Sequence, residues 1–207
     1  MLQEFQQLSN LSLDLIHAFE QEGIIQELPA EMEILKSGQY IKVIPIVLDG
    51  LIRVYTQHED KELLLYYIKP NESCIMSFAA SLKNEPSRVF AVTEEPTKAL
   101  LLPVDSVLKW IKQFPDMNAL FFQQYNMRYG EMLDTINHVL FDKLDKRLLD
   151  HLTKKSQLTG KNPIKISHRQ IANELGTARE VISRTMKKLE SEGLVIQHSH
   201  EIEIVKR

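Results

Sequence analysis

The chain has 207 residues, of which 43% are hydrophobic and 26% charged, and its formal net charge is −3 at pH 7. This length allows one large or two modest domains, and the composition is typical of a globular protein. No apolar run approaches the roughly 20 residues that a membrane-spanning helix needs. The first ten residues lack the basic and apolar regions of a signal peptide. We therefore expect a cytoplasmic protein with no membrane partner.

Cys74 is the only cysteine of the chain. An internal disulfide is therefore excluded, and no iron–sulfur cluster held by four cysteines of one chain is expected. A thiol at a helix N-terminus can act as a redox sensor. A small buried residue is the simpler interpretation of a lone cysteine between Ser73 and Ile75. Both interpretations stay open at this point, and the second is preferred.

Residues 28–104 alternate short apolar stretches with turn residues, which predicts β structure. The predicted strands are residues 43–48, 51–55, 63–68, 88–93 and 98–102. The dipeptide Asp49-Gly50 marks one turn, and residues 58–61 mark another. The apolar segment 75–82 is predicted to be a small helix. Short strands separated by turns favour a sandwich or a barrel.

Two helices are predicted after the β region, and Pro115 separates them. Asp105 is expected to cap the first, which ends at Gln113, and the second runs to about Phe141. Its apolar stripe consists of Leu120, Phe121, Tyr125, Met132, Ile136, Val139 and Leu140. Such a stripe suits either a two-stranded dimer seam or packing against the chain's own barrel.

Residues 165–193 predict two short helices joined by a tight turn. Ser167 and Gln170 form the pattern of a capping box at the first helix, and Gly176 is expected to end it. Thr177 is expected to cap the second helix, with Glu180 as its capping-box partner. The predicted buried face of the second helix consists of residues at helical spacing, Ala178, Ile182, Met186 and Leu189.

The free face of that second helix carries Arg179, Glu180, Ser183 and Arg184. Arginine can donate two hydrogen bonds to guanine, and glutamate can accept one from cytosine in the major groove of DNA. We predict that Arg179, Glu180 and Arg184 read bases and that Ser183 contacts a phosphate or a base. A solvated helix surface is the alternative, and a capping box would account for Glu180 without DNA.

The sequence of the C-terminal part predicts a β-hairpin wing, and this part of the chain carries a net positive charge. Residues 194–196 and 202–205 alternate around a polar turn, which is typical of a β-hairpin. Residues 143–207 hold 14 Lys and Arg against 8 Asp and Glu, whereas residues 1–142 hold 11 against 20. His198 and His200 suit DNA or solvent contact better than a metal. Further DNA-binding candidates are Ser167, His168, Arg169, Thr177 and Lys187, with Lys165 and Lys188 as additional phosphate contacts.

The string I-S-x-x-x-I-A-x-x-L-G-T-x-R-E-x-I-S-R-x-x-x-x-L-E-x-x-G, from Ile166 to Gly193, resembles the Crp/Fnr family of transcription factors. The resemblance implies an α+β fold. Its parts would be an antiparallel sensor β-barrel of the cyclic-nucleotide-binding type in residues 1–115, a dimerisation helix in 116–142 and a winged helix in 143–207. It also implies a homodimer that reads double-stranded DNA with TGTGA-like half-sites. A small-molecule effector and RNA polymerase would be further partners.

The resemblance is weaker at the effector pocket. Cyclic-nucleotide binders use a glutamate for the ribose and an arginine followed by serine or threonine for the phosphate. Glu72 stands where that glutamate would, but the best register places Glu85 where that arginine would stand, and its carboxylate would repel a phosphate. Arg88 could take the place of the arginine if the register slips. Cyclic AMP is therefore not the expected effector, whose identity stays unknown. The predicted effector pocket consists of Glu72, Ser73, Cys74, Ser87 and Arg88.

The sequence thus predicts a transcriptional regulator and not an enzyme. The alternative is a small-molecule-binding sensor or regulatory subunit that acts through protein contacts. It explains the barrel but leaves the recognition-helix face without a purpose. A cupin-type enzyme would need clustered histidines and a carboxylate on its strands, which this sequence lacks.

Overall fold

The computed structural model describes residues 11–58 and 61–205. They fall into two compact units, one with residues up to 56 and 65–131, the other with 57–64 and 132 onward. The first unit begins with α1 (Leu13–Glu22), β1 (Ile24–Leu28), β2 (Glu33–Leu35), β3 (Val43–Asp49), β4 (Ile52–His58) and β5 (Lys61–Ile68). It continues with α2 (Ile75–Lys83), β6 (Phe90–Thr93), β7 (Thr97–Pro103), α3 (Val104–Gln113) and α4 (Pro115–Phe141). The tip of the β4–β5 hairpin and the end of α4 belong to the second unit.

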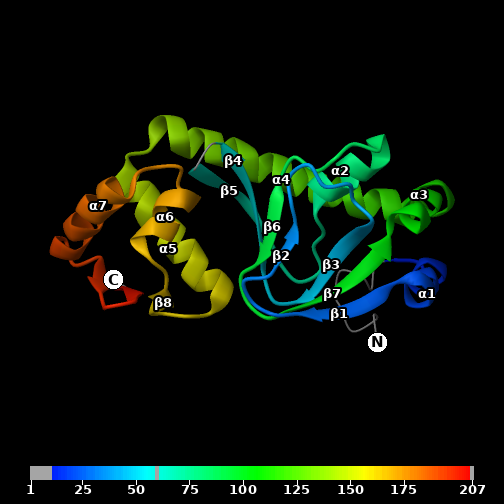
Figure 1. The fold of residues 1–207 in the computed structure, drawn as a ribbon, viewed down its shortest axis with the longest axis horizontal. Helices are drawn as coiled ribbons and strands as arrows, with labels where there is room; N and C mark the ends of the chain where they lie inside the picture. The colour runs from blue at the N-terminus through cyan, green and yellow to red at the C-terminus, as the bar shows by residue number, and fades with distance from the viewer. Residues whose placement is uncertain (1–10, 59–60, 206–207) are drawn as a thin grey trace. The chain divides into compact units, whose positions relative to one another are not determined.

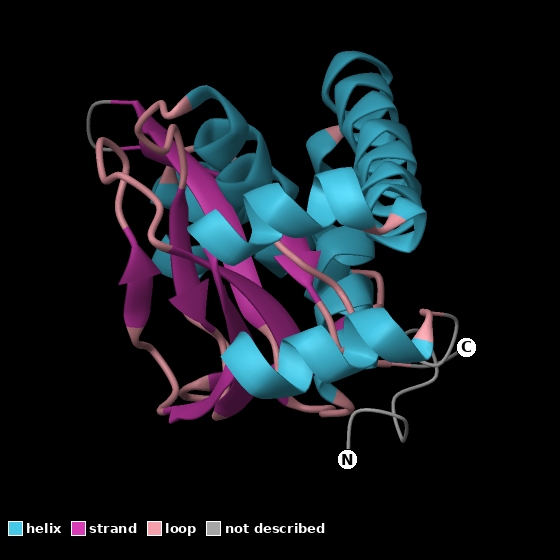
Figure 2. Cartoon of the chain, turned by 90° about the vertical axis from the view of Figure 1, so that its right-hand side faces the viewer, coloured by secondary structure: helices cyan, strands magenta, loops and turns pink. Residues whose placement is uncertain are grey.

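Two antiparallel sheets form the first unit, with strand orders β1-β7-β3 and β2-β6-β4-β5 (Figures 1 and 2). The predicted β-rich region and its five strands are confirmed. The sheets are not closed into a barrel, which corrects the prediction in that respect. A physical reason lies in β2, which has only three residues and a register shift between Glu33 and Leu35. Such a short edge strand offers too few backbone groups to bridge two sheets.

Strand β3 shows why its sequence is almost continuously apolar. Ile44, Ile46 and Leu48 pack with α1, α3 and α4, whereas Val47 belongs to the core between the sheets. Because alternate residues of a strand point to opposite faces, a strand covered on both sides needs apolar residues throughout. The following turn is as predicted, and Gly50 has φ +92°, where a Cβ would lie 2.6 Å from the Pro96 carbonyl oxygen.

The segment before β3 was not resolved into elements by sequence reasoning. Helix α1 buries Leu15, Ile16 and Phe19, and Phe19 packs against Trp110 of α3 with ring centroids 5.2 Å apart. Helix α3 begins at Val104 after Pro103, so Asp105 lies in its first turn and is not its cap. The fixed φ of proline suits this helix-start position.

The residues of the predicted apolar stripe lie on two different faces of α4. Leu120 and Phe121 pack into the first unit's core, whereas Tyr125, Met132 and Ile136 are exposed. The side chains of Val139 and Leu140 lie outside the described residues. Both uses considered for the stripe, internal packing and an open seam, are therefore present on different sides of one helix.

The second unit continues with α5 (Leu144–Thr159), β8 (Ile164–Lys165), α6 (His168–Glu174), α7 (Arg179–Ser191), β9 (Val195–Gln197) and β10 (Glu201–Ile204). Its three strands pair in the order β8-β10-β9, which confirms the predicted hairpin wing. The core joins the three helices to the sheet through Leu148, Leu152, Ile171, Ile182, Met186, Leu189, Val195 and Ile202. No helix in the described part of the chain is long and apolar enough to cross a membrane.

Candidate DNA-binding site

Helix α6 begins as the sequence predicts, but its capping box is half formed. The Ser167 hydroxyl accepts a hydrogen bond from the Gln170 backbone N–H at 3.1 Å. The Gln170 side chain does not return to the helix start and instead donates to Glu174 Oε1 at 2.9 Å. The buried carboxylate of Glu174 competes for that amide, because an unpaired buried acceptor would cost more than an unfilled cap at the surface.

The turn between α6 and α7 follows Gly176, which has φ +64°. The first residue of α7 is Arg179, and its N-cap is Ala178, which provides no side-chain hydrogen bond. The predictions that Thr177 caps α7 and that Ala178 is buried are therefore wrong. The Thr177 N–H donates to the Ala172 carbonyl at 2.9 Å, so Thr177 still belongs to the turn, and the exposed Ala178 starts the helix one residue later.

Helix α7 presents the predicted charged face to solvent. Its inner face, with Ile182, Met186 and Leu189, is buried. Arg179, Glu180 and Arg184 are exposed, and none of their side chains has a hydrogen bond or ion pair within the described part of the chain. These side chains keep their full hydrogen-bonding capacity for an external partner.

Ser183 is placed differently from the other predicted contact residues of α7. It is half-buried, and its Oγ lies 3.0 Å from Nδ1 of His168 in α6. This contact joins the two helices of the helix-turn-helix. The structure therefore gives Ser183 an internal partner and positions His168 beside α7.

A groove of about 470 Å³ lies between the start of α6 and the wing. It brings Ser167, His168 and Arg169 together with Arg179 of α7 and with wing residues 197–201. The sequence singled out most of these residues, but it did not show that α6, α7 and the wing share one groove. His198 also lies 3.1 Å from Glu203 through its Nε2. The described residues contain no group of three or more potential metal ligands.

The predicted phosphate contacts differ in their availability. Lys165 and Lys187 are exposed and have no partner among the described residues. Lys188 forms an ion pair with Asp145 of α5 and lies 3.8 Å from Glu192. The hydrogen bond to Asp145 raises the pKa of Lys188. Lys188 thus has a structural partner that Lys165 and Lys187 lack.

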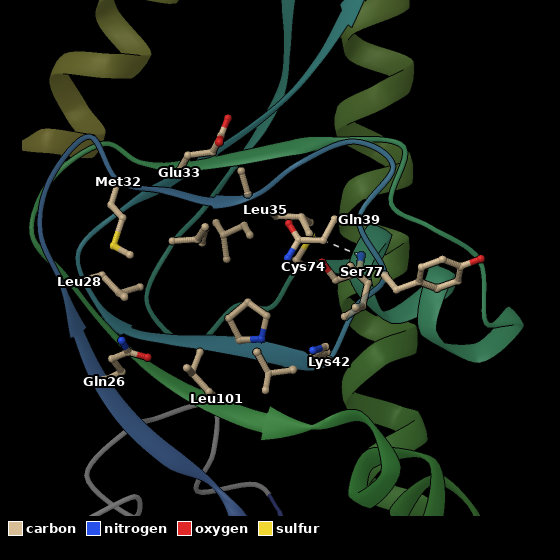
Figure 3. Close-up of a pocket in the computed structure, with 17 residues that line it drawn as sticks. Gln26, Leu28, Met32, Glu33, Leu35, Gln39, Lys42, Cys74, Ser77 and Leu101 are labelled. Atoms are coloured by element: carbon tan, nitrogen blue, oxygen red, sulfur yellow. Dashed lines mark hydrogen bonds between the residues drawn. The ribbon is translucent and has the colours of Figure 1, made fainter.

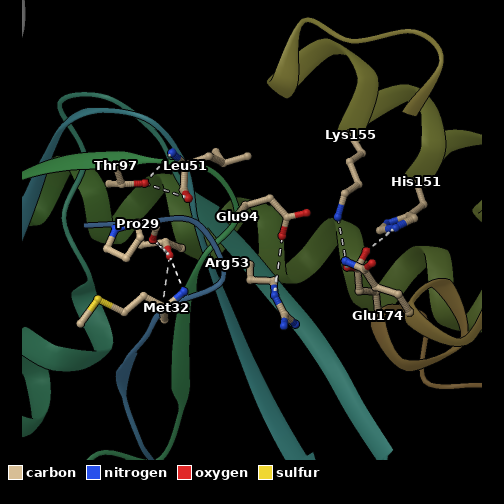
Figure 4. Close-up of polar contacts among 11 residues, drawn as sticks. Pro29, Met32, Leu51, Arg53, Glu94, Thr97, His151, Lys155 and Glu174 are labelled. Carbon is tan, nitrogen blue, oxygen red and sulfur yellow. Dashed lines mark hydrogen bonds and ion pairs between the residues drawn. The ribbon is translucent and has the colours of Figure 1, made fainter. Parts of the chain in front are cut away.

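A buried ion-pair network beneath α6 was not predicted (Figure 4). Glu174 Oε2 lies 2.7 Å from His151 Nε2, and Glu174 Oε1 lies 3.1 Å from Lys155 Nζ. Burial would raise the pKa of Glu174, but the hydrogen bonds and charges of His151 and Lys155 lower it to about 2. Both partners come from α5, so the network fixes α6 on α5. Their i, i+4 spacing was the available signal.

The predicted effector residues do not meet in one cavity. Glu72 is buried and forms an ion pair with Arg128 of α4, while it also accepts from the Lys69 N–H at 2.9 Å. Although burial disfavours the charged guanidinium, Glu72 and Glu131 raise the pKa of Arg128. The Ser73 N–H donates to Gln124 of α4 at 2.7 Å. The carboxylate expected for a ribose is thus already paired within the first unit.

The remaining predicted effector residues lie on different surfaces. Ser87 is buried, and its hydroxyl donates to the Val89 carbonyl at 2.9 Å. Arg88 is 80% exposed and pairs with Glu85 at 3.3 Å. Cys74 is buried and caps α2, where its Sγ accepts from the Ser77 N–H at 3.4 Å. Of the five, Cys74 alone lines the cavity between the two sheets.

The fold and the α6–α7 geometry define a two-unit protein with a helix-turn-helix DNA-binding domain. Residues 143–207 match the family model of the Crp-like helix-turn-helix domain. The C-terminal part of this chain is therefore a Crp-like helix-turn-helix domain, and the whole chain has the fold of the Crp/Fnr family of transcriptional regulators. The resemblance stated from the sequence is confirmed for the helix-turn-helix domain and for the fold of the whole chain.

Three solved structures illustrate this likeness. A Crp/Fnr-family transcriptional regulator from Eubacterium rectale has 24% identity and a TM-score of 0.85, over 96% of this chain and 92% of that one. The c-di-GMP responsive global regulator CLP of Xanthomonas campestris has 15% identity and a TM-score of 0.83, over 95% of this chain and 100% of that one. A Crp/Fnr-family transcriptional regulator from Thermus thermophilus has 20% identity and a TM-score of 0.77, over 88% of this chain and 94% of that one. A comparison with curated protein sequences finds no match.

Proposed function

We propose that this protein is a sequence-specific DNA-binding transcriptional regulator, and not an enzyme, that works as a homodimer. The observation that carries the proposal is the exposed face of α7 with Arg179, Glu180 and Arg184, whose side chains have no partner among the residues that the structure describes. A helix fits the major groove, where these side chains can bind guanine and cytosine edges. The adjacent groove with His168 and Arg169 offers donors for the DNA backbone.

The exposed side of α4 supports the dimer. Phe122 is 69% exposed and Tyr125 57%, and both lie far from the burial usual for such large apolar side chains. The exposed residues Phe122, Tyr125, Tyr129, Met132 and Ile136 repeat at alternating intervals of three and four. That spacing places them along one seam of a two-stranded coiled coil. A second copy of this chain is the partner that such a seam fits.

A dimer also suits the DNA geometry. One recognition helix reads only a few base pairs, whereas a two-fold dimer reads two half-sites about 10–10.5 base pairs apart. The resemblance at Arg179, Glu180, Ser183 and Arg184 supports TGTGA-like half-sites. The first unit would act as the sensor of a small-molecule effector, and RNA polymerase would be the downstream partner. Such a regulator works in the cytoplasm.

Fluorescence anisotropy tests the DNA reading directly. The full-length protein is titrated against a labelled palindrome with two TGTGA half-sites and against a scrambled duplex, across a salt series and with and without cyclic AMP. We expect tighter binding to the palindrome without cyclic AMP, because Glu72 is paired with Arg128. Equal affinity for both duplexes with and without nucleotide would contradict sequence-specific reading.

Sedimentation equilibrium tests the dimer. Met132→Glu places a charge in the seam and is expected to shift the protein to monomer, because an unpaired buried charge is costly. Gln123→Glu introduces the same charge on α4 outside the seam and serves as the matched control. A monomeric wild-type protein, or a Met132→Glu variant as dimeric as the control, would contradict the α4 seam.

A further inference from the structure

A cavity of about 290 Å³ lies between the two sheets of the first unit (Figure 3). Its lining includes the buried apolar side chains of Leu28, Leu35 and Ala91. Cys74, the N-cap of α2, and Ser77 of α2 also line it, and Gln26 and Gln39 add exposed polar side chains. The cavity opens to solvent, because lining residues such as Gln26, Tyr40 and Val43 are exposed, while the three apolar side chains at its wall are buried. The volume is close to the lower end of the roughly 300–1,000 Å³ of small-molecule sites.

Side-chain hydrogen bonds hold the rim of the cavity, and among the described residues the rim carries one charge without a partner. Thr93 holds the β1–β2 loop in place, because its hydroxyl donates to the Pro29 carbonyl at 2.7 Å and accepts from the Met32 N–H at 2.8 Å. Glu33 at the rim is already paired with Lys36 at 3.0 Å. Lys42 lines the cavity, is exposed and has no partner among the described residues. The free charge at the rim is therefore positive.

We propose that this cavity is a binding site for a small amphipathic anion, with its apolar body between the sheets and its negative group at Lys42. The apolar residues of the wall and the unpaired lysine at the rim favour such a molecule over a cyclic nucleotide, whose sugar and phosphate are polar throughout. The site is separate from Glu72, Ser87 and Arg88, which do not line it. The proposal deepens the sensor role proposed above and rests on it only for the coupling to DNA.

The inner end of the cavity is linked to α4 through buried contacts. Cys74 Sγ lies 3.6 Å from the Tyr66 hydroxyl, and the Arg128 guanidinium lies over the Tyr66 ring, 4.4 Å from its centroid. Arg128 in turn holds Glu72, two residues before Cys74. A ligand that displaces Cys74 or α2 therefore acts on residues that touch the proposed dimer helix. This chain of contacts gives the site a route to the DNA-binding state.

Isothermal titration calorimetry of the full-length protein with sodium octanoate tests the site. Octanoate has an apolar chain and one negative group, and 1-octanol and octylammonium supply the same chain with no charge and with a positive charge. We expect one octanoate per chain, weaker binding of octanol and weaker still of octylammonium. Lys42→Gln should weaken octanoate about fivefold, which corresponds to about 1 kcal/mol for a partly exposed ion pair, and should leave octanol unchanged.

Two further variants locate the site. Lys98→Gln removes an exposed lysine of β7 that does not line the cavity, and it should bind octanoate like the wild type. Ala91→Leu fills the cavity from β6 and should abolish octanoate binding. If this variant does not fold, the octanoate affinities of Lys42→Gln and Lys98→Gln still test the proposal. Absence of octanoate binding, binding at several equivalents, or equal affinity in the two lysine variants would overturn the proposal. Loss of palindrome specificity would refute the proposed function and leave this measurement intact.

Discussion

The arginines of the two units are used in opposite ways. Arg128 in the first unit is buried, paired with Glu72 and Glu131 and stacked on Tyr66. Arg179 and Arg184 in the second unit are exposed and have no partner among the described residues. A paired, desolvated charge holds a fold together, whereas a solvated free charge is available to a ligand. The charges of Arg179 and Arg184 are therefore available to an anionic partner. Glu72, the carboxylate expected to bind a ribose, is instead already paired with Arg128.

The largest expected effect comes from breaking the buried pair of the first unit. Glu72→Ala should lower the free energy of unfolding by about 3–5 kcal/mol, because Arg128 would keep a buried charge without its main partner. Urea denaturation followed by fluorescence of Trp110, the only tryptophan and a buried core residue, measures it. The double replacement Glu72→Met with Arg128→Met should recover most of the loss. A cost below about 1 kcal/mol for Glu72→Ala would mean that the pair behaves as a surface ion pair.

The second effect concerns the buried carboxylate of the DNA-binding unit. The pKa of Glu174 is about 2 in the folded state, below its ordinary 4.5, so its stabilisation is present above pH 4.5 and is lost as the pH falls toward 2. Glu174→Gln should therefore cost about 3 kcal/mol at pH 7 and little at pH 2. Circular dichroism during denaturation at several pH values measures it, with Asp150→Asn on the exposed side of α5 as control. Parallel acid profiles of wild type and Glu174→Gln would contradict the assignment.

The third effect separates base reading from phosphate contact on α7. Arg184→Ala should weaken binding to the palindrome by about 1–3 kcal/mol and relax the preference at one base position. Lys187→Ala should weaken all duplexes alike and reduce the salt slope by about 1. Anisotropy titrations with single-base variants of the site measure both. Identical profiles for the two variants would remove the distinction between a base reader and a phosphate contact.

The smallest effect compares two residues that the sequence assigned the same role. Ser167→Ala should cost about 1 kcal/mol of stability, because Ser167 caps α6 through a side-chain hydrogen bond. Thr177→Ala should change stability by less than about 0.5 kcal/mol, because Thr177 does not cap α7. Thermal denaturation of the two variants compares them. An equal loss in both would show that Thr177 stabilises the turn by another contact.

Sequence reasoning was most accurate where the signal is local. The helix-turn-helix, Gly176, the buried residues Ile182 and Met186 and the wing follow from helical spacing, turn residues and strand alternation. Local errors concern the cap of α7, Asp105 and the Gln170 half of the α6 capping box. The first two are shifts of one or two residues, because helix starts depend on backbone geometry that several neighbouring residues can satisfy. The third arises because the Gln170 side chain pairs with the buried Glu174.

By itself, the sequence determined the Crp/Fnr-type order of the chain, the charged face of α7 and the separation of negative and positive charge between its parts. Only the tertiary structure decided that Glu72 pairs with Arg128 and Glu174 with Lys155 and His151. It also decided that a cavity opens between the sheets beside Lys42. The physical reason is that periodicity is a property of neighbouring residues, whereas a buried pair or a cavity depends on side chains that folding brings together from distant segments.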